Sequence, residues 1–153
     1  MMSKALIVYH GETGDIKLLA DKIKQRLENL GIQVTTSQDK QFKDFGSIRE
    51  YDIISLGAPC LTCKKCHGSE ECRAPKLLRR HLKKLFKMDL KSKKLITFAY
   101  SADPEKIQWI NKRIETLIAP TKIKPTASIG YSGKPTDSLD EAIKTAIAGQ
   151  SIK

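Results

Sequence analysis

All four cysteines of this 153-residue chain lie within residues 60–72, in the pattern CxxCxxCxxxxxC. Two-residue spacers let successive sulfurs turn inward around one small centre while backbone amides donate hydrogen bonds to them. Gly68 supplies the backbone freedom that the chain needs to swing round before the last cysteine. The spacing therefore predicts a [4Fe-4S] cluster, with the ligands Cys60, Cys63, Cys66 and Cys72.

Zinc is the main alternative for this metal site, because four thiolates bind tetrahedral zinc well and would order a long loop. Zinc cysteines usually come as two CxxC pairs with a longer spacer, which favours the cluster. Free or disulfide-forming thiols are the third interpretation. The N-terminal run 1–9 has no cleavage site and predicts a strand instead of a signal peptide, so we expect a reducing, cytoplasmic location. No segment approaches the roughly 20 apolar residues of a membrane span.

Strand and helix patterns alternate along the rest of the chain. Apolar, β-branched runs predict strands at 4–9, 32–36, 52–56, 94–100 and 123–129. Apolar residues at helical spacing predict helices over 16–30, from Pro75 to 88, from 103 to 117 and over 139–147. This order calls for one α/β domain, 1–153, with a parallel sheet covered by helices on both faces and a cysteine-rich loop at 57–74.

The loops after the first, third and fourth predicted strands are the natural place for a ligand. In open parallel sheets a ligand binds beyond the carboxyl ends of the strands, where the strand order reverses. We therefore expect the loops 9–15, 57–74 and 100–103 to lie side by side. Neither a Ser-His-Asp set, nor paired catalytic carboxylates, nor a Walker loop is visible, so the sequence does not support hydrolysis or phosphoryl transfer.

The stretch 8–16, VYHGETGDI, resembles the flavodoxin phosphate loop, in which backbone amides and hydroxyls at a helix start surround the phosphate of FMN. Thr13 and Gly14 match the Thr-Gly of that family, while Gly11 and Ile16 stand where it usually has Ser or Thr. The resemblance covers nearly the whole chain in element order. It implies a three-layer sandwich with sheet order 2-1-3-4-5. The FMN contacts that it implies are His10, Gly11, Glu12, Thr13, Gly14, Asp15, Ala58, Pro59 and, stacked on the ring, Tyr100.

The compact cysteine set also resembles that of the iron-sulfur flavoproteins, which are flavodoxin-like electron carriers with FMN and a [4Fe-4S] cluster. In that family the cysteines follow an earlier strand, whereas here they follow the third predicted strand. The resemblance implies an electron carrier, or an oxidoreductase if the protein is an enzyme. In either case the cluster loop would flank the flavin.

Positive charge is concentrated after the cysteines. The net charge is +11, and residues 64–94 hold twelve lysines and arginines against three acidic residues. The basic helix 75–88 would steer an acidic redox partner such as a ferredoxin to this face. The alternative function is a zinc-ordered module without flavin, whose basic face binds nucleic acid or an acidic protein. Few aromatic residues are interleaved with these cations, which disfavours single-stranded nucleic acid. An ordinary solvated helix face is the simplest interpretation of the charge.

Overall fold

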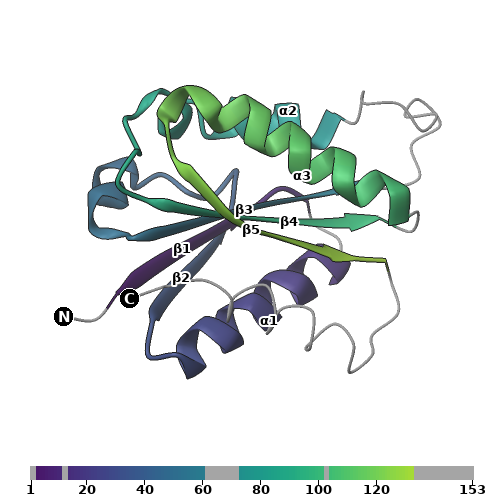
Figure 1. Ribbon diagram of the computed structural model, residues 1–153, viewed down its shortest axis with the longest axis horizontal. Coiled ribbons are helices and arrows are strands. Elements are labelled where there is room, and N and C mark those ends of the chain that lie inside the picture. The colour runs from purple at the N-terminus through teal and green to yellow at the C-terminus, as the bar shows by residue number, and fades with distance from the viewer. Residues whose placement is uncertain (1–2, 12–13, 61–72, 102–103, 133–153) are drawn as a thin grey trace.

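The computed structural model describes residues 3–11, 14–60, 73–101 and 104–132, and a five-stranded sheet forms its centre (Figure 1). The strands are β1 (Lys4–Tyr9), β2 (Gln33–Gln38), β3 (Ile53–Cys60), β4 (Lys94–Ser101) and β5 (Lys124–Tyr131). They lie in the order β2-β1-β3-β4-β5, and every neighbouring pair is parallel. The predicted α/β class and sheet order are confirmed.

Helices cover the sheet on both faces, which gives three layers. The helix α1 (Gly14–Asn29) lies below the sheet in Figure 1, while α2 (Arg73–His81) and α3 (Pro104–Ile118) lie above it. Short 3-10 turns occur at η1 (Phe45–Glu50), η2 (Leu85–Lys87) and η3 (Ala119–Thr121). The helix predicted over 139–147 lies outside the described residues. None of the described helices is long and apolar enough to cross a membrane.

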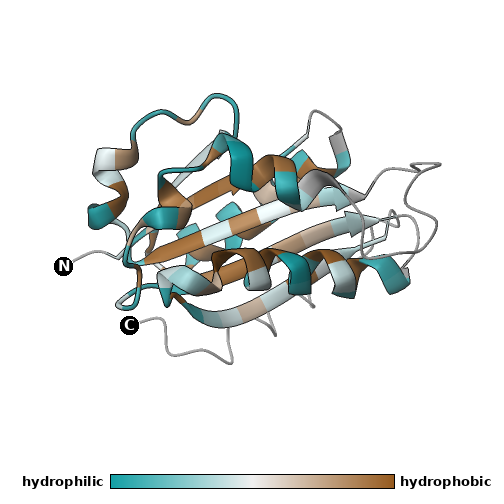
Figure 2. Ribbon diagram, turned by 90° about the horizontal axis from the view of Figure 1, so that it is seen from above, coloured by the Kyte–Doolittle hydropathy of each residue, from teal (hydrophilic) through white to brown (hydrophobic). Residues whose placement is uncertain are grey.

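Two hydrophobic clusters, one on each face, hold the layers together. In β1, Leu6 and Val8 belong to the cluster under α2 and α3, while Ile7 and Tyr9 belong to the cluster over α1. A strand that is buried on both faces needs such a continuous apolar run, and this is why β1 was recognisable from sequence. In Figure 2, which views the sheet from the side of α2 and α3, the central strands are coloured mostly as hydrophobic.

The apolar stripe predicted on the first helix is confirmed except at its end. Its buried members are Ile16, Leu19, Ala20, Ile23 and Leu27. Leu30 is 44% exposed, because α1 ends at Asn29 and Gly31 follows with a φ of 83°. A positive φ directs the chain away from the helix axis, as at many helix C-termini.

The predicted start of the cysteine-rich loop at Gly57 is wrong, because β3 continues to Cys60. A Cβ added at Gly57 would lie 2.1 Å from Cε2 of Phe98, whose fully buried ring packs on this backbone from β4. The glycine is therefore required by close packing inside the sheet and not by a turn. At the other end, residues 73–74 belong to α2, and the intervening residues 61–72 lie outside the described part of the chain.

The basic helix predicted over 75–88 is shorter than expected. The helix α2 ends at His81, and η2 follows at Leu85–Lys87. Backbone hydrogen bonds from Lys87 to Lys84 and from Met88 to Leu85 span three residues, so the chain tightens there. The apolar stripe itself is confirmed, since the side chains buried in the core include Leu78, Leu82, Leu85 and Phe86.

Candidate functional site

The carboxyl ends of β1, β3, β4 and β5 meet at one edge of the sheet. Their register pairs Tyr9 with Gly57, Pro59 with Tyr100, and Tyr100 with Tyr131. The chain segments that follow β1, β3 and β4 therefore start at the same edge. This is the arrangement that the strand order led us to expect for a ligand site.

The segment after β1 rests directly on the end of β3. The backbone N–H of His10 donates to the carbonyl of Gly57 at 2.9 Å. Gly11 has a φ of 112°, and a Cβ at this position would lie 3.0 Å from Cγ of Pro59. Both the backbone conformation and the narrow space therefore require glycine here. The predicted contact residues Glu12 and Thr13 lie outside the described residues, and α1 begins at Gly14.

The side chains of Asp15, Tyr100 and Tyr131 gather at the part of this edge formed by β4 and β5. The rings of Tyr100 and Tyr131 have centroids 5.6 Å apart and are tilted by 54°. Partial burial raises the pKa of the Tyr100 phenol, and so do the negative charge of Asp15 and a hydrogen bond with its carboxylate. Asp15 lies in the first turn of α1. The structure thus joins two of the predicted site residues, Asp15 and Tyr100, across the edge of the sheet.

Two other predicted contact residues lie inside the strand. Ala58 is fully buried in the hydrophobic cluster under α2 and α3, so its side chain supports the edge from within. Pro59 is also buried, and its ring lies against Gly11.

The cysteines can be placed only in part. Cys60 is the last residue of β3 and pairs in register with Ser101 of β4. The other three predicted ligands, Cys63, Cys66 and Cys72, lie outside the described residues. Since α2 begins at Arg73, the segment that carries them leaves from the carboxyl edge of the sheet and leads directly into α2.

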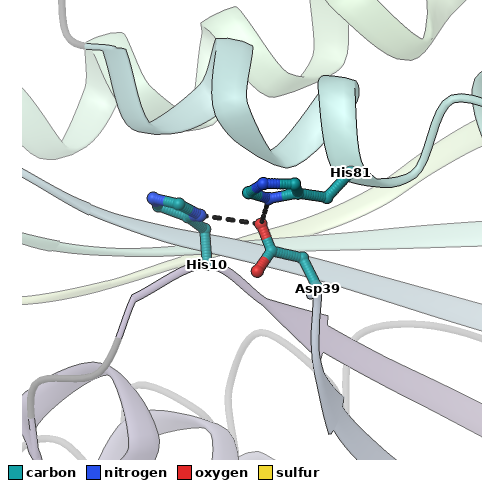
Figure 3. A group of neighbouring side chains, drawn as sticks. All are labelled: His10, Asp39 and His81. Carbon is teal, nitrogen blue, oxygen red and sulfur yellow. Dashed lines mark hydrogen bonds and ion pairs between the residues drawn. The ribbon is translucent and has the colours of Figure 1, made fainter. Parts of the chain in front are cut away.

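A second group of chemically active side chains lies at the β1–β2 end of the same edge (Figure 3). Oδ2 of Asp39 lies 2.7 Å from Nδ1 of His10 and 2.8 Å from Nδ1 of His81. The two imidazoles are stacked, with centroids 5.8 Å apart. Asp39 is only 2% exposed, and its Oδ1 accepts a hydrogen bond from the backbone N–H of Lys40 at 2.8 Å.

The electrostatic state of Asp39 follows from these partners. Burial by itself raises the pKa of a carboxyl group, but the hydrogen bonds and positive charge of His10 and His81 outweigh it and hold the pKa of Asp39 below its usual value. Asp39 is therefore a buried carboxylate, charged at neutral pH, whose one oxygen faces two imidazoles.

The sequence placed His10 among the predicted FMN contacts, and it singled out neither Asp39 nor His81, which lies within the predicted basic helix 75–88. A usable signal existed: Asp39 directly follows β2, which pairs with β1, and His10 directly follows β1. The backbone N–H of Asp39 indeed donates to the carbonyl of Tyr9 at 2.9 Å. The part that could not be foreseen is His81, which comes from the end of α2.

No protein-family model matches this chain. No curated protein sequence matches it either. Among solved structures, it is similar to a Streptococcus pneumoniae TIGR4 flavodoxin (TM-score 0.75, 15% identity, 95% of this chain and 96% of the other). It is also similar to a short-chain flavodoxin associated with a bacterial microcompartment (0.75, 19%, 97% and 96%) and to flavodoxin 2 from Bacillus cereus (0.72, 20%, 95% and 97%). At these identities the likeness shows a shared flavodoxin-like fold.

Proposed function

We propose that this protein is an electron-transfer flavoprotein that binds FMN at the carboxyl edge of its sheet and holds a [4Fe-4S] cluster on its four cysteines. The observation that carries the proposal is the convergence of the Gly11 segment, the first turn of α1 and Tyr100 at one edge. The likeness to flavodoxins over almost the whole chain supports it.

The start of α1 would bind a flavin phosphate mainly through backbone amides. The first turn of α1 presents backbone N–H groups that have no partner within the helix, and such groups favour an anion. Ile16 is fully buried against the sheet, so its position contributes to packing and not to the phosphate. Binding would therefore depend on these backbone amides and on Thr13, with less help from hydroxyl groups than flavodoxins have.

Tyr100 fits the role of an aromatic that stacks on the flavin ring. It is the next-to-last residue of β4, an interior strand of the sheet, and it is partly exposed. A hydrogen bond with Asp15 and the ring contact with Tyr131 restrict the orientation of its ring. A side chain that is positioned in advance loses less conformational entropy when a flat ligand stacks on it.

The position of Cys60 would place a metal centre close to that ring. Cys60 is the neighbour of Ser101 across the sheet, and Ser101 directly follows Tyr100. A cluster that starts from Cys60 would thus stand at the same edge as the flavin. When bound, FMN and the cluster would supply the redox chemistry, while the chain sets their spacing and surroundings.

The same proposal includes an acidic redox partner that docks on α2 and the turn after it. The exposed cations of this basic surface are Lys76, Arg79, Arg80, Lys83, Lys84 and Lys87. The segment leading into α2 carries the cysteines, so a partner on the basic surface would lie near the cluster. Contacts of this kind associate quickly and weaken as salt concentration rises.

Anaerobic purification followed by absorption spectroscopy and by iron, sulfide, zinc and flavin analysis tests the proposal. We expect flavin bands and a brown iron-sulfur shoulder, and Cys63→Ala should remove the shoulder and the iron but leave the flavin. Tyr100→Ala should weaken FMN binding by about 1–3 kcal/mol, whereas Tyr100→Phe, which keeps the ring, should not. A colourless protein with one zinc per chain would contradict the proposal and favour the flavin-free binding module.

A further inference from the structure

The group formed by His10, Asp39 and His81 is here called the His-Asp-His cluster, and Asp39 and His81 take no part in the proposed flavin and cysteine chemistry. Its three residues come from the end of β1, the end of β2 and the last turn of α2. One donor atom from each of them lies within 4.8 Å of the others. Such convergence of two imidazoles on a buried carboxylate needs an explanation beyond packing.

The donor types match those that divalent transition metals bind. Neutral imidazole nitrogens and a carboxylate oxygen suit Zn²⁺, Co²⁺, Ni²⁺ and Fe²⁺, and a set of two histidines and one carboxylate leaves other coordination positions open. Because these donors are nitrogen and oxygen, the site differs in chemistry from the thiolates of the cysteine segment. The two centres should therefore prefer different metals.

The distances also fit. Two ligands with bonds of about 2.1 Å to one metal ion lie about 3.0 Å apart at a right angle and about 3.4 Å apart at the tetrahedral angle that zinc prefers. Oδ2 of Asp39 is 2.7 Å from one Nδ1 and 2.8 Å from the other, so each pair needs to separate by about 0.2 to 0.7 Å when an ion binds. Each ring would then carry its proton on Nε2 and offer the lone pair of Nδ1 to the metal.

Burial and support around the cluster favour a preformed site. Asp39 is 2% exposed, and Lys40 N–H orients the carboxylate through its other oxygen, which is the role that outer hydrogen bonds play in metal sites. The side chains of His10 and His81 are 15% and 25% exposed, so solvent reaches the imidazole side. A metal ion could enter from that side and keep water or a small ligand in its open positions.

We propose that His10, Asp39 and His81 bind one divalent transition metal ion, of the class of Zn²⁺ or Co²⁺, through two imidazole nitrogens and one carboxylate oxygen. The ion links the ends of β1, β2 and α2. His10 and Asp39 are 29 residues apart in the chain, and Asp39 and His81 are 42 residues apart. Binding to the folded state alone also raises the stability of the protein. The proposal does not depend on FMN or on the cysteines.

The chain has three histidines, which makes the test specific. We would titrate the full-length purified protein with Co²⁺ and with Zn²⁺ and follow the imidazole signals of His10, His67 and His81 by NMR, with calorimetry for affinity and stoichiometry. The expected result is saturable binding of one ion that shifts or broadens the signals of His10 and His81 together and leaves that of His67 unchanged.

Variants separate this site from the cysteine segment. His81→Gln removes one ligand at a partly exposed position and should weaken binding at least roughly tenfold, while the matched control His67→Gln should bind as tightly as the unchanged protein. Asp39→Asn should weaken binding similarly, and circular dichroism checks that each variant is folded. If His81→Gln binds with unchanged affinity, if the ion shifts only His67, or if no saturable binding occurs, the cluster is a hydrogen-bonded structural network and the proposal is overturned.

Discussion

Gly57 offers the sharpest quantitative prediction, because the structure shows what its missing side chain leaves room for. A Cβ at this position would lie 2.1, 2.3 and 2.4 Å from three ring atoms of Phe98. Ordinary van der Waals contact begins at 3.4 Å, so Gly57→Ala requires a shift of about 1.3 Å in the ring or the strand. The ring is fully buried between β4 and the α1 layer, and a close-packed core does not yield that far without strain.

We therefore expect Gly57→Ala to lower the free energy of unfolding by about 3 kcal/mol, at the upper end of what overpacking a core usually costs. Phe98→Leu removes the ring atoms that clash, and by itself it should cost about 1–3 kcal/mol through lost packing. In the double variant the added methyl group occupies part of the space that the ring has left. The loss of unfolding free energy in the double variant should then be smaller than the sum of the two single losses by at least about 1 kcal/mol.

Urea unfolding followed by circular dichroism measures all four members of this cycle. Gly46→Ala is the matched control, because the nearest atom to a Cβ there is Oδ1 of Asp44 at 3.9 Å and the residue is exposed. Its effect should stay within about 0.5 kcal/mol. Two results would contradict this reasoning: Gly57→Ala as stable as the unchanged protein, or stability losses of the two substitutions that simply add. In either case close packing of the Phe98 ring does not require glycine at position 57.

Two further predictions concern ionisable groups. Asp15→Asn should lower the pKa of Tyr100 toward its ordinary value, because one cause of the raised pKa is the charge of Asp15, and an unchanged NMR titration of that ring would refute the contact. The raised pKa also means that the folded protein keeps this proton to a higher pH than the unfolded chain does. The stability that Tyr100 contributes is therefore complete below pH 10.0 and is lost as pH rises above that value. Asp15→Asn should lose less stability over the same rise in pH. Lys93→Met removes the buried amine that donates to the carbonyls of Arg49 and Tyr51, and it should cost about 1–3 kcal/mol in thermal or urea unfolding. Lys91→Met, at an exposed position, should cost less than about 0.5 kcal/mol, and equal effects of the two would show that the buried hydrogen bonds do not matter.

The sequence by itself determined the elements and their layering. The apolar runs of β1, β3 and β4 and the stripes on α1 and α3 follow from burial of a strand on two faces and of a helix on one, and neighbouring residues carry that information. The strand order was implied by the resemblance of residues 8–16 to a phosphate loop, together with the alternation of strand and helix. The elements and their buried faces are local features, so they could be predicted without knowing the tertiary contacts.

The candidate site shows where local information ends. The sequence correctly indicated that the segments after β1, β3 and β4 start at one edge. It predicted that the third strand ends before Gly57, because nothing in the neighbouring residues shows that β3 continues to Cys60 with Ala58 buried in the core. The contact that requires glycine at this position comes from the ring of Phe98, which is 41 residues away and packs against a backbone without a side chain.

Only the tertiary structure decided the His-Asp-His cluster. His10, Asp39 and His81 are each unremarkable in their own stretches of sequence, and they become one site because β1 pairs with β2 and the last turn of α2 lies over that end of the sheet. Periodicity describes which face of an element is buried, and it contains no information on which buried polar groups from different elements meet. The contacts between distant residues determine that, through the packing of the complete fold.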